Sequence, residues 1–210
     1  MTADANQPCC ATEPVHVAGT TPYPWPYDGK LAPARLALVV TGWDEHWRAA
    51  VAPAGTGAVA AAVANIVRLA SAVDRTFTVA HPPLPVRGPV PAPGEPVPAV
   101  GAIPGAVAVA AAGVDGFYGG PLAALLRRAG VDQILLAGFG LETTVHSTMR
   151  SANDAGLECL AVVDACVALD PGLTPRTVSM IEMSGGIFGA VGATAPVLDA
   201  LTASCRCPAA

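Results

Sequence analysis

Short, mostly apolar runs alternate with longer helix-like segments along most of this chain. The runs are rich in valine, leucine, isoleucine and alanine, which is typical of buried strands. They lie at 36–40, 76–80, 106–110, 133–137 and 158–163, with a further short strand expected at 188–191. Helices are expected at 49–73, 122–129, 145–155, 176–183 and 196–203. This alternation predicts a mostly parallel sheet with helices on both faces, a three-layer α/β/α class of Rossmann-like type.

Composition narrows the class of protein. The 210 residues are enough for one domain with a sizeable core, and 52% of them are hydrophobic while 13% are charged. The net charge of −5 without a basic cluster argues against a nucleic-acid partner. Asn65 and Arg68 interrupt the longest apolar stretch, and Asp4 lies where a signal peptide would carry positive charge. We therefore expect no membrane segment and a cytoplasmic location.

Three parts are expected along the chain. Residues 1–30 form an extended arm, because prolines at alternate positions forbid a helix. Its aromatic residues Tyr23, Trp25 and Tyr27 are expected to cover either the same domain or a neighbouring subunit. Residues 31–204 form the α/β domain, and 205–210 form a short tail.

The cysteines offer little chemistry by their spacing. Cys9 and Cys10, and Cys205 and Cys207, lack the two-to-four-residue spacer of a zinc knuckle, so disulfides or free thiols are favoured over a metal. Cys159 and Cys166 flank an apolar run and are expected to be small buried side chains.

The segment 138–148 predicts a strand end, a tight glycine turn and a helix N-terminus. Such a turn directs backbone N–H groups at whatever lies there, and enzymes often place a nucleophile at this point. In parallel sheets ligands bind at the carboxyl ends of the strands, so the segments after Val40, Ala110 and Ala137 are expected to form one crevice. Thr144 occupies the nucleophile's place.

Separate blocks of the sequence, at 134–148, 152–160, 164–166 and 183–191, together resemble the isochorismatase-like cysteine hydrolase family. This family includes nicotinamidases and biuret hydrolases, and the proline-rich arm is similar to that of the biuret-hydrolase-like branch. The resemblance implies the α/β fold and an amidohydrolase acting on non-peptide C–N bonds without a cofactor. It also implies a catalytic triad of aspartate, lysine and cysteine.

Each triad position implied by the resemblance holds another residue in this sequence. The aspartate would close the first strand, where Thr41 stands. The lysine would lie six residues before Phe117, where Ala111 stands, and the cysteine would be at Thr144. Lys30 is the single lysine and lies upstream of the first strand. The resemblance therefore implies that the family's cysteine chemistry is lost.

Two hypotheses for the role of Thr144 stay open. It acts as a nucleophile with Asp44, Glu45 or His146 as its base, or it only caps its own helix. The latter is favoured, because a secondary alcohol is a poor nucleophile without a base. His81 with residues 44–46 lacks the spacing of a metal site, and a solvated turn is expected there. A crevice that still binds an amide or a carboxylate would be formed by Asp44, Phe117, Gly140, Leu141, Glu142, Thr143 and Thr144.

These observations favour a catalytically degenerate protein. It would serve as a structural or regulatory subunit, either as a homo-oligomer or as a hetero-oligomer with an active paralogue. Two alternatives remain: an active hydrolase of biuret- or ureido-type amides with a rebuilt site, and a small-molecule-binding sensor.

Overall fold

A computed structural model describes residues 14–83, 103–183 and 185–204. The two cysteine pairs and the tail at 205–210 lie outside these residues. So does most of the stretch 82–105, which its many prolines and glycines predict to be a loop. None of the helices in the described ranges is long and apolar enough to cross a membrane.

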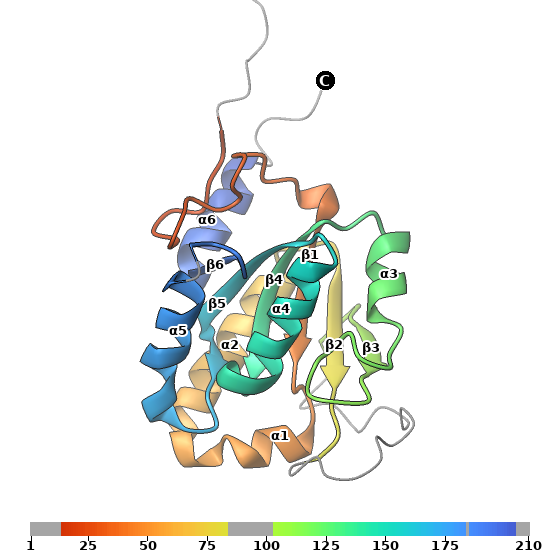
Figure 1. Ribbon diagram of the computed structural model, residues 1–210, viewed down its shortest axis with the longest axis vertical. Helices are drawn as coiled ribbons and strands as arrows, with labels where there is room; N and C mark the ends of the chain where they lie inside the picture. Colours follow the sequence, from red (N-terminus) through yellow and green to blue (C-terminus); the bar gives the residue numbers. More distant parts are fainter. Residues whose placement is uncertain (1–13, 84–102, 184, 205–210) are drawn as a thin grey trace, which may run out of the picture.

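The described strands form one six-stranded sheet in the order β3-β2-β1-β4-β5-β6, and all neighbouring pairs are parallel (Figure 1). The α/β class with a parallel sheet is therefore confirmed. Chain order reverses between β1 and β4, which places a topological switch point there. The strands are β1 (Leu36–Thr41), β2 (Thr76–Ala80), β3 (Val107–Ala110), β4 (Gln133–Phe139), β5 (Glu158–Val167) and β6 (Ala190–Gly192).

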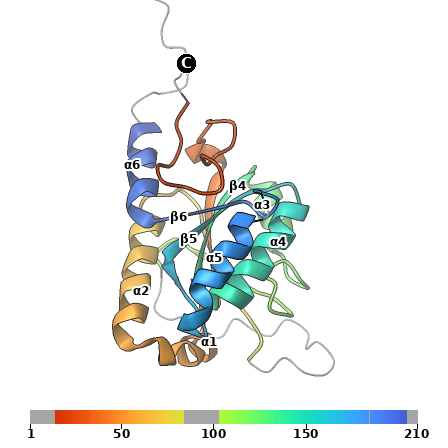
Figure 2. The same ribbon diagram turned by 60° about the vertical axis from the view of Figure 1, so that its left-hand side comes forward.

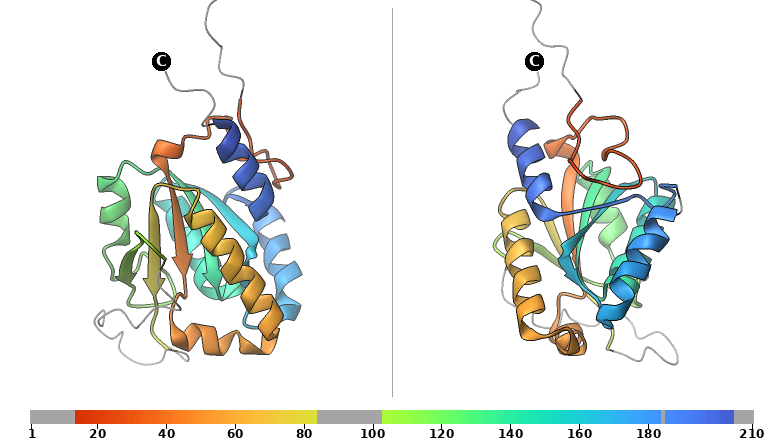
Figure 3. Two further views of the ribbon diagram at one scale, coloured as in Figure 1. Left: turned by 180° about the vertical axis from the view of Figure 1, so that it is seen from behind. Right: turned by 90° about the vertical axis from the view of Figure 1, so that its left-hand side faces the viewer.

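Helices cover both faces of the sheet, as Figures 2 and 3 show. One face packs against α2 and α6, and the other packs against α3, α4 and α5. Side chains alternate between the two cores along each strand, so Leu38 and Val40 face α2 while Val39 faces α4. The helices are α1 (Glu45–Ala50), α2 (Thr56–Ala70), α3 (Leu122–Arg128), α4 (His146–Asp154), α5 (Thr174–Met183) and α6 (Thr194–Ser204).

The single helix expected at 49–73 is wrong. The chain instead forms α1, a short 3-10 turn at Ala52–Ala54, and α2. Pro53 lies in that turn and Gly55 follows it with a φ of 93°, a conformation that breaks a helix. The strand expected at 188–191 begins later, at Ala190, and the strand expected to end at 163 continues to Val167.

The described part of the arm, 14–30, folds back on its own domain. Trp25 is fully buried and belongs to the core on the α2 and α6 face of the sheet, whereas Tyr27 is 78% exposed. Thr21 and Val191 exchange two backbone hydrogen bonds of 3.1 and 2.8 Å, so the arm pairs with the edge strand β6. The arm therefore covers an edge that would otherwise present unpaired backbone groups.

Candidate functional site

The carboxyl ends of β1 and β4 bring two of the predicted site residues together. Thr41 ends β1 and pairs in register with Gly138 of β4. Its side chain lies on the same face as that of Val39, toward α4. There the Thr41 and Thr144 hydroxyl oxygens lie 3.2 Å apart. Positions separated by 103 residues in sequence thus meet at the switch point of the sheet.

A π-helical turn, Leu141–Val145, holds Thr144 at this place. Gly140 precedes it in the left-handed region with a φ of 81°, which a side chain would adopt only with strain. The Thr144 hydroxyl donates to the Phe139 carbonyl, a bond back into the preceding strand. With its single proton directed there, the Thr144 oxygen is available as an acceptor for the Thr41 hydroxyl, which also lies 3.4 Å from the Ala137 carbonyl.

The two threonines are closed off from solvent. Thr41 and Thr144 are both 0% exposed. Trp47 lies directly against Gly140, where the turn that carries Thr144 begins. The rings of Trp43 and Phe139 stack with centroids 5.6 Å apart in the core on the other face of the sheet. A substrate would have to displace buried packing before it reached either hydroxyl.

Ala111, the third predicted triad position, follows β3 at the same edge of the sheet. Its backbone N–H donates to the Ala80 carbonyl at 2.9 Å, and the residue is 4% exposed. Because β2 lies between β3 and β1, the strands of Ala111 and Thr41 are about 10 Å apart. A methyl group cannot bridge that distance, so Ala111 supplies no polar group to the threonine pair.

Asp44 is not part of a solvated turn, and that expectation is wrong for this residue. It is 0% exposed and serves as the N-cap of α1. Its two carboxylate oxygens accept from the backbone N–H groups of Trp47 at 2.9 Å and His81 at 3.1 Å. Glu45 is exposed and pairs with Arg48. Neither carboxylate is hydrogen-bonded to Thr144.

The other residues predicted to line a crevice are engaged in holding the turn. Glu142 accepts from the backbone N–H groups of Leu169 and Asp170 at 3.1 and 2.9 Å, which fastens the turn to the segment after β5. Thr143 donates to the Gly140 carbonyl, and Leu141 is buried in the core. Phe117 is half-buried against the same core.

Two histidines near this edge are hydrogen-bonded to groups other than the threonines. His146 accepts from Arg150 at 3.3 Å and packs edge-on against Phe188, so it does not serve as a base for Thr144. Burial, and secondly the charge of Arg150, lowers the pKa of His146. His81 donates from Nδ1 to the Gly113 carbonyl at 2.8 Å, while its buried Nε2 has no partner among the described residues.

The thiols in the described ranges do not replace the missing nucleophile. Cys166 lies on β5 beside Gly138, and burial raises the pKa of its thiol to about 12. Cys159 is fully buried, and burial likewise raises its pKa. Both therefore remain protonated at neutral pH and are inert as nucleophiles. Within 14–83, 103–183 and 185–204, no three His, Cys, Asp or Glu residues lie close enough together to hold a metal ion.

The arrangement is a chain of neutral hydrogen bonds from Thr41 through Thr144 to the Phe139 carbonyl. Sequence reasoning located both hydroxyls but missed the acceptor. A backbone carbonyl leaves no trace in a sequence, and the contact between the two hydroxyls forms only in the tertiary fold.

Comparisons with known proteins agree with this architecture. The sequence model of the isochorismatase domain matches residues 36–195. An isochorismatase family protein from Burkholderia thailandensis is 26% identical, with a TM-score of 0.64 over 82% of this chain and 98% of that one. A cysteine hydrolase from Pseudomonas syringae pv. phaseolicola has a similar fold, at 20% identity and a TM-score of 0.67 over 83% and 95% of the two chains. YcaC from Pseudomonas aeruginosa, in a structure with a covalent acrylamide, matches at 14% identity and a TM-score of 0.64 over 84% and 85%.

Proposed function

The chain belongs to the isochorismatase family, and on that premise we propose that it is a catalytically degenerate member. In this proposal it serves as a structural or regulatory subunit, in a homo-oligomer or in a hetero-oligomer with an active paralogue. The observation that carries the proposal is the buried, neutral hydrogen-bond chain at Thr41 and Thr144.

Nucleophilic catalysis at this place would need a base and an open path. The described hydrogen-bond partners of the Thr144 hydroxyl are Thr41, Phe139 and Gly140, and none of these groups takes up a proton at neutral pH. General acid–base catalysis contributes about 10²–10⁴-fold to rate, so its loss removes most of the chemistry. The zero exposure of both hydroxyls removes the path as well.

The surface supports association with another chain. Large apolar side chains are exposed at the end of α5 and beside the arm: Met183 by 79%, Ile187 by 66% and Tyr27 by 78%. Gly186 lies against Tyr23, which brings the arm and the segment after α5 together. Large exposed apolar groups on neighbouring segments are a common feature of protein–protein contacts.

The catalytic half of the proposal is tested by assays of the purified protein on ureas, amides and imides. We expect no turnover above the buffer rate, and no change in Thr144→Ala. Thr148→Ala replaces a fully buried threonine on α4 and is the matched control for a purely structural cost. Turnover that Thr144→Ala abolishes and Thr148→Ala preserves would establish a rebuilt hydrolase instead.

The assembly half is tested by sedimentation of the protein alone and after co-expression with a triad-bearing family member. The double variant Met183→Glu, Ile187→Glu is expected to dissociate the complex. Val67→Glu, which places the same charge at an exposed valine on α2, should leave it intact. A wild-type chain that sediments as a monomer in both settings would exclude the subunit role and leave binding of a small molecule as the alternative.

A further inference from the structure

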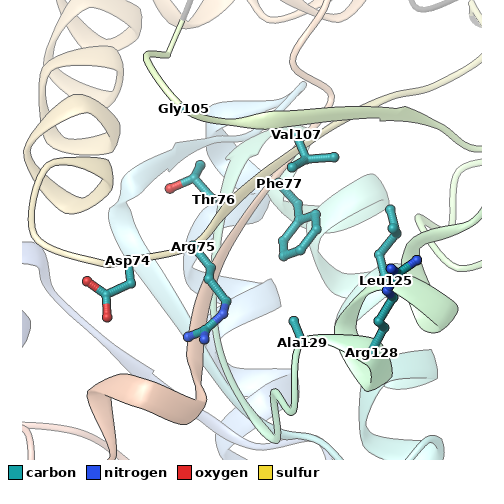
Figure 4. A pocket seen from close by; sticks show the side chains of 9 residues that line it. All are labelled: Asp74, Arg75, Thr76, Phe77, Gly105, Val107, Leu125, Arg128 and Ala129. Atoms are coloured by element: carbon teal, nitrogen blue, oxygen red, sulfur yellow. The ribbon is translucent and has the colours of Figure 1, made fainter.

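A cavity lies at the amino edge of the sheet, opposite the threonine pair. It measures about 400 Å³, within the range of small-molecule sites. Its wall is formed by the starts of β2 and β3 and the end of α3, as Figure 4 shows. Its lining residues are Asp74, Arg75, Thr76, Phe77, Gly105, Val107, Leu125, Arg128 and Ala129.

The floor of this cavity is apolar. Phe77 is 5% exposed and lies between the side chain of Arg75 and those of Leu125 and Arg128 (Figure 4). Val107, on the edge strand β3, is 46% exposed and completes this surface. A flat or branched hydrocarbon group would therefore find a complementary surface there.

Polar donors surround the floor without acidic partners. Arg75 donates from Nη1 to the Ala34 carbonyl at 2.8 Å, which fixes the guanidinium and leaves its other N–H groups available. Arg128 makes no hydrogen bond or ion pair with any residue that the structure describes. Thr76 pairs in register with Leu38, whose side chain faces α2, so its hydroxyl lies on the other face of the sheet from Phe77. The carboxylate of Asp74 is directed away from Phe77, at the outer rim (Figure 4).

We propose that this cavity binds a small carboxylate with a compact apolar body. The carboxylate accepts from the guanidinium groups of Arg75 and Arg128, and the hydrocarbon part lies on Phe77, Val107 and Leu125. Arginine is suited to this role because its planar donors match a carboxylate. The site is independent of the threonine pair, since it lies at the other end of the strands.

Phenylacetate is the probe for the test, and phenylacetamide is its neutral isostere. Proton–nitrogen correlation spectra of the full chain are recorded during titration with each compound. We expect saturable shifts at Thr76, Phe77 and Leu125 with phenylacetate, and binding of the amide about tenfold weaker because the charge-assisted bonds are lost. No saturable shifts at these residues, or equal binding of both compounds, would overturn the proposal.

Neighbouring arginines on α3 provide a matched pair of variants. Arg127 and Arg128 are both exposed in the last turn of the helix, but only Arg128 lines the cavity. Arg128→Gln should weaken phenylacetate binding about tenfold, and Arg127→Gln by less than about twofold. Val107→Trp should block the cavity and abolish the shifts. Equal losses in the two arginine variants would indicate general charge attraction and contradict a specific site.

Discussion

Buried threonines lie in different surroundings at the two edges formed by the carboxyl and the amino ends of the strands. At the carboxyl edge the hydroxyls of Thr41 and Thr144 bond to one another and to a carbonyl, and both residues are fully buried. At the amino edge the hydroxyl of Thr76 has no partner in the described residues, and Arg75 and Arg128 line a cavity beside the same strand. The difference teaches that the polar side chains are buried and hydrogen-bonded at the edge where the family's chemistry is expected. Polar side chains that are free to bind a ligand lie at the opposite edge.

The largest expected effect is at Gly138, whose φ is 128°. A Cβ there would collide with the backbone oxygen of Thr41, in the two central strands. Gly138→Ala should therefore lower the free energy of unfolding by about 4 kcal/mol or more, measured by urea denaturation. Gly130→Ala is the control at the amino edge, where φ is 67° and no atom lies within 4 Å of the added carbon. It should cost about 1–2 kcal/mol, and equal costs would show that the close contact of β1 and β4 is not rigid.

The next largest difference between the two edges is expected when a charged side chain is introduced at each. Thr41→Asp places a carboxylate in a fully buried, neutral environment, and the free energy of unfolding should fall by about 3 kcal/mol at neutral pH. Thr76→Asp places it at the first residue of β2, which keeps 6% exposure, and a smaller loss of about 1 kcal/mol is expected there. If Thr41→Asp were the milder variant, the carboxyl edge would be more polar and more open than the contacts indicate.

A smaller, pH-dependent effect belongs to the carboxyl edge. Burial lowers the pKa of His81, while its bond to Gly113 and the charges of Asp44 and Asp115 act in the opposite direction. The folded state then binds fewer protons than the unfolded chain, whose histidines titrate near 6.5. Stability from this source is present above about pH 6.5 and is lost as the pH falls.

Histidines titrate between about pH 7.5 and 5.5. Over this range the urea midpoint of His81→Asn should fall less steeply than that of the wild type. His46→Asn, on the exposed side of α1, should keep the wild-type slope. Glu158 acts with the opposite sign, because burial raises its pKa and its contribution is lost as the pH rises. It is common to all three proteins, so the difference between them reports His81. Identical slopes would mean that His81 is solvated.

Several elements follow from local sequence alone. The strand at 76–80 coincides with β2, and the helix at 122–129 ends within one residue of α3, because their apolar periodicity and glycine stops are local signals. The prediction that a strand ends at 163 was wrong, because Asp164 is a polar residue of the kind that ordinarily ends a buried run. Its carboxylate accepts from Thr194 N–H and hydroxyl, both at 2.8 Å, so a distant segment allows β5 to continue. Pro53 and Gly55 were a local signal that the single-helix prediction overlooked.

For the candidate site, the sequence by itself determined the scaffold and which side chains stand at the strand ends: two hydroxyls and a methyl group at Thr41, Thr144 and Ala111. Residue type fixes those chemical groups wherever the chain places them. Only the tertiary structure decided that the hydroxyls bond to each other, that both are fully buried, and that Arg75 and Arg128 line one cavity. Those facts depend on contacts between distant strands and helices, and on backbone carbonyls that every residue carries alike.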